Sequence, residues 1–91
     1  MQGTMSEAPV CFYTSVGCHL CEKAEALLQL LLGESFAELT LVEVSDSDDL
    51  VASYGLRIPV LAGKAADGEW LELAWPFDAD EIQEFFARIE P

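Results

Sequence analysis

The sequence predicts one small α/β domain with the element order β-α-β-α-β-β-α. Short apolar runs rich in β-branched and aromatic residues alternate with amphipathic helical patterns, which is typical of this class. The first strand, helix and second strand fit within about 35 residues, the size of a βαβ unit with parallel strands and a right-handed crossover. The 52% hydrophobic content of the 91 residues argues for a packed core. Residues 1–8 are expected to form a flexible tail and residues 9–91 the single domain.

The first strand is expected over residues 9–14, which form a short apolar and aromatic run. Its Cys11 is expected to pack in the core, because free cysteine is among the most buried residue types. The first helix is expected from Leu20, where apolar side chains begin to recur at helical spacing, until Gly33 supplies a stop.

The middle of the chain predicts two further strands and a short helix. Residues 36–44 are expected to form the second strand, and their nearly continuous apolar character favours a buried strand over a half-exposed edge. A short helix is expected within residues 45–54, opened by a Ser or Asp cap and closed by Gly55. Residues 59–73 are expected to form a β-hairpin around a glycine-containing turn over residues 63–68.

The last element is expected to be an amphipathic helix. Asp78 and Glu81 form a capping-box pattern in front of it. An apolar stripe at helical spacing follows, made of Ile82, Phe85, Phe86 and Ile89. Trp75 and Phe77, just ahead of the cap, are expected to pack against this helix rather than to rim a functional site.

The charge of the chain limits its partners. With 17 acidic and 4 basic residues the formal net charge is −13, which disfavours nucleic acids and anionic membrane surfaces. No secretory leader and no run long enough to cross a bilayer is visible in the sequence, so a cytoplasmic protein is expected. In a reducing compartment, a C-x-x-C pair is more often redox-active or metal-binding than a structural staple.

Such a pair, Cys18 and Cys21, stands between the first strand and the first helix. Residues three apart lie on one face of a helical turn, so the two sulfurs can close a small-ring disulfide. Free N–H groups and the positive end of the helix dipole favour a thiolate at Cys18 and place its pKa at roughly 3.5–7.5. Cys21, one turn inside, is more sheltered and suited to resolving a mixed disulfide formed at Cys18.

With this pair, and with an Ile-Pro at the head of the third strand, the chain resembles the small bacterial glutaredoxin-like proteins of the thioredoxin fold. Residues 14–28, 54–61 and 75–77 carry the likeness. The resemblance implies a four-stranded mixed sheet flanked by helices. It also implies a thiol-disulfide oxidoreductase in which Cys18 attacks substrate disulfides and Cys21 resolves the intermediate.

The resemblance further implies a substrate-binding segment at the Ile-Pro. In the family this proline is cis and lies against the redox pair, which implies a cis bond between Ile58 and Pro59. The backbone of Ile58 would then face outward and pair with an extended substrate or with glutathione. Arg57, next to it, is expected either to receive a substrate carboxylate or to pair with a neighbouring carboxylate of the chain.

The chain departs from the family at three places. His19 and Leu20 separate the cysteines, where thioredoxins have Gly-Pro and many glutaredoxins have Pro-Tyr. Residues 73–78 lack the Gly-Gly and Asp that hold glutathione in glutaredoxins, apart from Asp78. Few basic residues can meet the carboxylates of glutathione, and the candidates are Lys23 and Arg57. No resident cofactor is therefore expected, with glutathione as a possible cosubstrate.

His19 is predicted either to stabilise the Cys18 thiolate, as a cation or hydrogen-bond donor, or to be an exposed residue without a role. For the oxidoreductase, the expected partners are a disulfide-containing protein or low-molecular-weight thiol and an unidentified reductant, with the chain acting as a monomer. One alternative is a metal or iron–sulfur module that uses Cys18 and Cys21 in a dimer, because one chain lacks a second ligand pair. Another is an interaction domain with a vestigial redox site.

Overall fold

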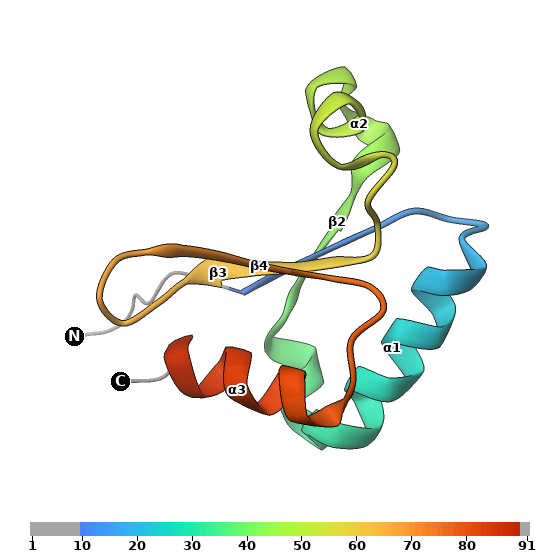
Figure 1. Cartoon of the computed structure of the whole chain (residues 1–91). Coiled ribbons are helices and arrows are strands. Elements are labelled where there is room, and N and C mark those ends of the chain that lie inside the picture. The colour runs from blue at the N-terminus through green and yellow to red at the C-terminus, as the bar shows by residue number, and fades with distance from the viewer. Residues whose placement is uncertain (1–9, 90–91) are drawn as a thin grey trace.

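The computed structural model describes residues 10–89, and the tail expected over residues 1–8 lies outside them. Four strands and three α-helices follow the expected β-α-β-α-β-β-α order (Figure 1). Their bounds are β1 Cys11–Thr14, α1 His19–Leu32, β2 Thr40–Glu43, α2 Asp48–Tyr54, β3 Val60–Lys64, β4 Trp70–Ala74 and α3 Ala79–Ile89. Short 3-10 helices at Gly33–Glu38 and Val44–Asp46 flank β2.

The four strands form one mixed sheet in the order β2-β1-β3-β4. β1 and β2 are parallel, as the βαβ unit predicts, whereas β3 is antiparallel to both β1 and β4. Val60 at the start of β3 pairs with Tyr13 near the end of β1 and with Ala74 at the end of β4. The loops after β1, before β3 and after β4 therefore leave the sheet at the same end.

Helices cover both faces of the sheet. In Figure 1, α1 and α3 lie on one side and α2 on the other. Phe12 points to the α1 and α3 side, where the larger core consists of Phe12, Ala24, Leu28, Leu61, Phe77, Ile82 and Phe85. Tyr13 points to the α2 side, where the smaller core consists of Tyr13, Val44, Val60 and Ala62. Successive strand residues alternate between the two cores, as pleated strands require.

The expectation of a buried second strand over residues 36–44 is wrong. Only Thr40–Glu43 is a strand, and β2 lies at the edge of the sheet, with Leu41 52% exposed. Phe36 and Leu39 do pack against the larger core, but from the 3-10 segment rather than from a strand. A short apolar run has no periodicity that separates these two conformations, which explains the error.

The expected helix caps are confirmed. The N–H of Glu81 donates to Asp78 Oδ1 at 2.8 Å and the N–H of Asp78 donates to Glu81 Oε1 at 3.0 Å, which is a capping box. Ser47 caps α2 by accepting from the N–H of Leu50 at 3.3 Å. The hairpin is also confirmed, although its first strand continues through Lys64 and the turn is shorter than expected. None of the helices in residues 10–89 has the length and apolar character needed to cross a membrane.

Candidate active site

Cys18 and Cys21 form a disulfide at the start of α1, with their Cα atoms 5.2 Å apart. Cys18 is the N-cap residue of α1, and its Sγ accepts the N–H of Cys21 at 3.1 Å. The sulfur therefore occupies the place that a Ser or Asp oxygen takes in most helices. In the reduced protein the same N–H and the positive end of the helix would stabilise a thiolate at Cys18.

The two cysteines differ in accessibility. Cys21 is only 2% exposed, because it lies one turn inside α1 and faces the sheet. Cys18 is half-buried at the tip of the helix. Cys18 is therefore the more accessible sulfur of the pair, and the division of roles between the two cysteines stays a prediction.

The loop that presents Cys18 is held by Glu43 at the end of β2. Its carboxylate accepts the N–H of Val16 at 3.0 Å and the hydroxyl of Ser45 at 2.8 Å. Hydrogen bonds from Ser15 and Ser45 hold the pKa of Glu43 below its usual value. Gly17 completes the loop with a φ of 79°, a left-handed conformation that suits glycine. Sequence reasoning missed Glu43, although an acidic residue at the end of the strand parallel to β1 was a usable signal.

The segment before β3 lies at the same end of the sheet as this loop. The Ile58–Pro59 peptide bond is cis, and the carbonyl of Pro59 accepts the N–H of Trp75 at 3.0 Å. The N–H of Ile58 donates to the carbonyl of Tyr54 at 3.0 Å, so it does not face outward as the resemblance implied. An extended substrate could therefore pair here only with the carbonyl side of Ile58.

The segment after β4 also returns to this end, with a second cis bond between Trp75 and Pro76 that the sequence did not predict. Phe77 is 4% exposed and belongs to the larger core, against which Trp75 is partly buried. Their rings meet edge to face with centroids 5.1 Å apart. Both residues thus have the packing role that was favoured for them.

His19 lies in the first turn of α1, with its side chain 91% exposed. Its Nδ1 is 3.9 Å from Glu22 Oε1, one turn further along the helix. The exposed imidazole is in contact with solvent rather than enclosed beside a sulfur. Its role in stabilising a Cys18 thiolate stays a prediction.

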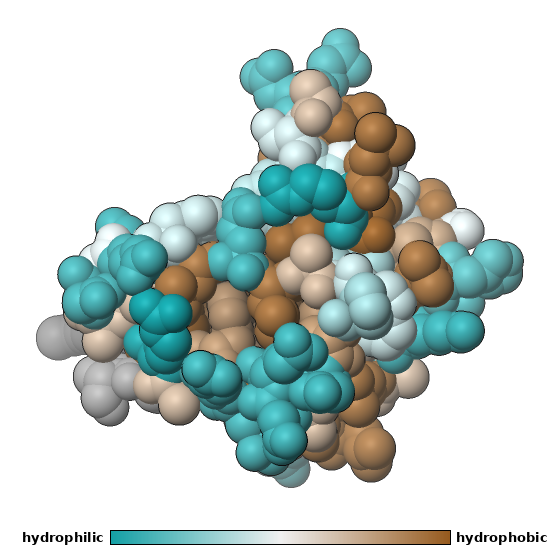
Figure 2. All heavy atoms as spheres, viewed as in Figure 1, coloured by the Kyte–Doolittle hydropathy of each residue, from teal (hydrophilic) through white to brown (hydrophobic). Residues whose placement is uncertain are grey.

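Exposed apolar side chains lie next to the cysteines in the sequence and in the segment between α2 and β3. Val16 is 86% exposed, Leu20 47% and Leu56, in the segment between α2 and β3, 104%. Figure 2 shows hydrophobic surface over α2 and toward the end of the sheet that carries the loop before α1. This end of the molecule therefore has apolar side chains exposed at its surface.

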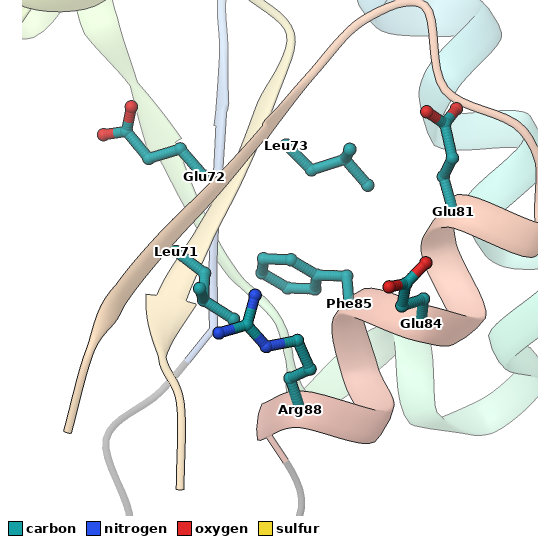
Figure 3. A pocket seen from close by; sticks show the side chains of 7 residues that line it. All are labelled: Leu71, Glu72, Leu73, Glu81, Glu84, Phe85 and Arg88. Carbon is teal, nitrogen blue, oxygen red and sulfur yellow. The ribbon is translucent and has the colours of Figure 1, made fainter. Parts of the chain in front are cut away.

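A separate hollow lies between β4 and α3. It is lined by Leu71, Glu72, Leu73, Glu81, Glu84, Phe85 and Arg88, none of which belongs to the loops around the disulfide (Figure 3). Leu71, Leu73 and Phe85 form its apolar part, whereas the side chain of Glu72 points away from them. The side chain of Glu72 therefore lies on the opposite face of the sheet.

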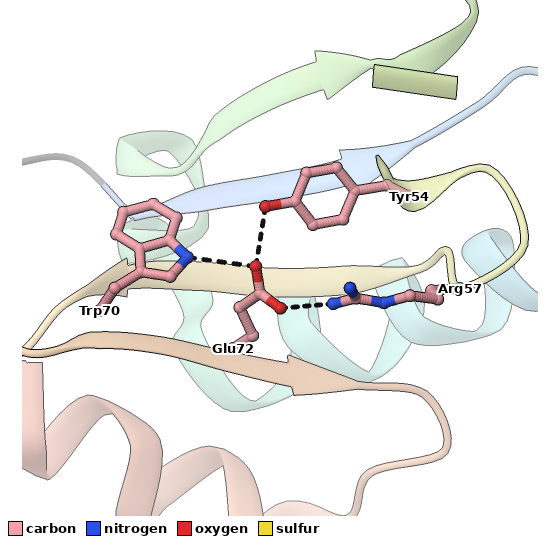
Figure 4. A network of polar contacts seen from close by, with 4 residues as sticks. All are labelled: Tyr54, Arg57, Trp70 and Glu72. Carbon is pink, nitrogen blue, oxygen red and sulfur yellow. Dashed lines mark hydrogen bonds and ion pairs between the residues drawn. The ribbon is translucent and has the colours of Figure 1, made fainter. Parts of the chain in front are cut away.

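On that face, Glu72 joins three other side chains in what we call the Glu72 cluster: Tyr54, Arg57, Trp70 and Glu72 (Figure 4). Glu72 Oε1 forms an ion pair with the guanidinium of Arg57. Glu72 Oε2 accepts the hydroxyl of Tyr54 at 2.8 Å and the indole N–H of Trp70 at 3.1 Å. Arg57 also lies over the ring of Tyr54, with its Cζ 5.1 Å from the centroid. The expectation that Arg57 pairs with a neighbouring carboxylate is thus met by Glu72.

The protonation of the cluster follows from these contacts. Partial burial acts to raise the pKa of Glu72, but hydrogen bonds from Tyr54, Trp70 and Arg57 outweigh it and hold the pKa below its usual value. Burial, and then the bond to Glu72, raise the pKa of Tyr54. At neutral pH, Glu72 is therefore ionised and Tyr54 neutral. Sequence reasoning missed Trp70 as a partner of Glu72, although a spacing of two residues places both side chains on one face of a strand.

The third cysteine, Cys11, is a half-buried free thiol at the edge of the smaller core rather than a fully buried residue. Burial raises the pKa of its thiol. Within residues 10–89, no three His, Cys, Asp or Glu side chains come together in a way that could hold a metal ion.

Comparison with known proteins agrees with this geometry. The sequence pattern of a glutaredoxin-like domain (DUF836) matches residues 9–87. Among solved structures, the target protein XcR50 from X. campestris is similar, with 32% identity, a TM-score of 0.67, and coverage of 86% of this chain and 95% of that one. Protein Ne2328 from Nitrosomonas europaea is similar too, with 28% identity, a TM-score of 0.64, and coverage of 93% and 98%.

No protein with a curated description matches the sequence significantly. The thioredoxin-like fold expected from the sequence is confirmed by the mixed sheet and by these structural neighbours. The domain match and the paired cysteines together indicate a redox-type role.

Proposed function

The chain belongs to the glutaredoxin-like domain family (DUF836), and on that basis we propose that it is a thiol-disulfide oxidoreductase with Cys18 and Cys21 as its redox couple. The observation that carries the proposal is the placement of Cys18 as the N-cap of α1, in a disulfide with the nearly inaccessible Cys21. A structural staple would gain nothing from this asymmetry, whereas a nucleophile and a resolving thiol need it.

In the proposed reaction the Cys18 thiolate attacks one sulfur of a substrate disulfide. A bond forms between Cys18 Sγ and that sulfur while the substrate S–S bond breaks, and the departing thiolate takes a proton from water. The Cys21 thiolate then attacks Cys18 Sγ and releases the second substrate thiol. Two electrons have passed to the substrate, and a thiol reductant restores the dithiol.

The protein acts in this proposal as a cytoplasmic monomer without a resident cofactor. Its substrate is the disulfide of a protein or of a low-molecular-weight thiol. The half-buried Cys18 at the end of the sheet, with the exposed Val16 and Leu56 nearby in the loops, supports an encounter with a substrate chain. Pro59, whose side chain is fully buried, would position this segment rather than touch the substrate.

The test is the reduction potential of the couple in a glutathione redox buffer, with zinc and iron assayed on the same sample. A two-electron transition confined to Cys18 and Cys21 is the expected result. Bound metal without such a transition would identify a ligand pair instead. An accessible Cys18 thiol of ordinary pKa, about 8.5, that undergoes no exchange would identify a vestigial site.

Variants separate the two cysteines. Cys18→Ser is expected to abolish disulfide reduction, because Cys21 is nearly inaccessible and Cys11 lies in β1 rather than at the start of α1. Cys21→Ser is expected to accumulate mixed disulfides at Cys18 that mass spectrometry detects. Cys11→Ser is the matched control, because it removes a thiol that lies on the α2 side of the sheet. If Cys21→Ser reduces protein disulfides as fast as the wild type, the dithiol scheme is wrong.

A further inference from the structure

We propose that the Arg57–Glu72 ion pair determines substrate class, so that the redox site favours disulfides without carboxylates near the sulfur over the disulfide of glutathione. This inference rests on the proposed function, because it concerns the substrate of the same two cysteines. It adds a residue, Glu72, that contacts neither cysteine and acts through Arg57.

The first step is position. The segment that carries Arg57 leads directly into Pro59 and β3. It lies at the end of the sheet where β1 ends and the chain continues to Cys18. Of the chain's four basic residues, Lys64 lies at the far end of β3, and Arg88 lies in the last turn of α3, where it pairs with Glu69 at 2.9 Å. Lys23 lies on α1, the helix that carries Cys21. Arg57 is thus the one basic residue of the proline segment, residues 57–59.

The second step is engagement. Glu72 neutralises Arg57, and the Tyr54 ring beneath the guanidinium fixes its direction. Tyr54 is itself held, because its ring stacks on Tyr13 with centroids 4.1 Å apart and planes 12° from parallel. Glu72 accepts from three side chains at once, so that releasing Arg57 alone would not let the carboxylate turn away. Glu72 and Tyr54 therefore hold the guanidinium on this face of the sheet (Figure 4).

The third step is what remains for a substrate. Val16, Leu20 and Leu56 present apolar surface on the segments around the disulfide. The chain as a whole carries a net charge of −13, which repels anions. Glutathione presents carboxylates on both sides of its sulfur, and with Arg57 neutralised they meet no cation at the proline segment. A neutral disulfide meets no such electrostatic repulsion.

The experiment compares single-turnover oxidation of the reduced protein by two probes, glutathione disulfide and the neutral bis(2-hydroxyethyl) disulfide. Each turnover converts the Cys18 and Cys21 thiols to their disulfide and releases two thiols of the probe. The measured quantity is the second-order rate constant for glutathione disulfide divided by that for bis(2-hydroxyethyl) disulfide. Glu72→Gln keeps an acceptor for Tyr54 and Trp70 but frees Arg57, and is expected to raise the ratio about fivefold.

Glu69→Gln is the matched control, because it removes the same charge and frees Arg88 at the other end of the molecule. Its ratio is expected to change less than twofold. The gain of Glu72→Gln is expected to shrink in about 0.5 M NaCl, since the attraction is electrostatic. In Arg57→Gln/Glu72→Gln, which keeps the net charge, the ratio is expected to return to the wild-type value.

The outcomes are decisive in each direction. Equal gains for Glu72→Gln and Glu69→Gln would mean that net charge alone sets the ratio, and the inference would fall. A ratio in the double variant well below the wild-type ratio would show that Arg57 attracts the carboxylates of glutathione even when it is paired with Glu72. That result would overturn the inference. If Glu72→Gln does not fold, the salt dependence of the wild-type ratio decides instead: a rise in about 0.5 M NaCl is expected because salt screens the net negative charge, and a fall would show that Arg57 attracts glutathione and would overturn the inference. If neither probe oxidises Cys18 and Cys21 in the wild type, the proposed function itself has failed.

Discussion

At the residue scale, two carboxylates near the loops of the candidate site accept hydrogen bonds from separate parts of the chain. Glu43 at the end of β2 accepts from Val16 and Ser45, and Glu72 in β4 accepts from Tyr54, Arg57 and Trp70. Each carboxylate has a pKa below its usual value, so each is ionised under physiological conditions. Hydrogen bonds to ionised acceptors are stronger than neutral ones, which is why these two residues can hold loops.

The lowered pKa of Glu72 predicts a specific dependence of stability on pH. A group whose pKa is lower folded than unfolded stabilises the fold above its unfolded pKa, about 4.3 for Glu. This contribution is lost as the pH falls through the lower folded value. Urea unfolding between about pH 6 and pH 3 should therefore show a smaller acid-induced loss of unfolding free energy in Glu72→Gln than in the wild type.

Glu69→Gln is the control for this comparison as well, because the Glu69 side chain is 61% exposed whereas that of Glu72 is 29% exposed. Its acid dependence should follow that of the wild type. If Glu69→Gln and Glu72→Gln lose stability in parallel, the side chains around Glu72 do not stabilise its ionised form as the contacts indicate.

His19 gives a second prediction at this scale. Because its side chain is 91% exposed, solvent screens its effect on the neighbouring sulfur. Replacing His19 with Gln should shift the reduction potential of the Cys18–Cys21 couple by less than about 15 mV, equivalent to about 0.7 kcal/mol. Redox titration at pH 6 and pH 8 measures this. A larger shift that appears only at pH 6 would establish the imidazolium as a thiolate stabiliser.

At the scale of elements, the sequence predicted those features that depend on neighbours along the chain. The cap of α3, the hairpin and the C-x-x-C at the start of α1 are encoded within a few residues each, and all three are found. The edge position of β2 and the gathering of Tyr54, Arg57 and Trp70 at Glu72 depend on strand order and register. Residues far apart in sequence meet there, and no local pattern records which strands are neighbours.

The capping box of α3 yields a prediction about stability. Asp78→Ala removes the acceptor for the N–H of Glu81 at the start of the helix that carries Ile82 and Phe85 into the larger core. We expect the free energy of unfolding in urea to fall by about 1 kcal/mol. Asp80→Ala, two residues further on, removes the same charge without the cap and should cost less than half as much. Equal losses would assign the effect to the helix dipole rather than to the cap.

At the scale of the whole molecule, strand order and charge decide how the candidate site is presented. The reversal between β1 and β3 brings the loop before α1, the proline segment and the start of α3 to one end of the sheet. This is the reason that Arg57 and Cys18, nearly forty residues apart in sequence, share one end of the fold. The net charge of −13 sets the electrostatic field through which any charged ligand approaches that end.

The net charge of −13 predicts how the free energy of unfolding depends on salt concentration. Two effects oppose one another: salt weakens the exposed ion pairs of Arg57 and Arg88, and it screens the repulsion among the excess carboxylates. Exposed pairs contribute only about 0–1 kcal/mol each, whereas the repulsion acts among many charges in a domain with a radius of gyration of 13.0 Å. We therefore expect the free energy of unfolding in urea to rise between about 10 mM and 200 mM NaCl and then to level off, as screening does. A fall over this range would mean that the two ion pairs outweigh the repulsion, and a rise that stays linear to high concentration would identify a general effect of salt on apolar burial instead.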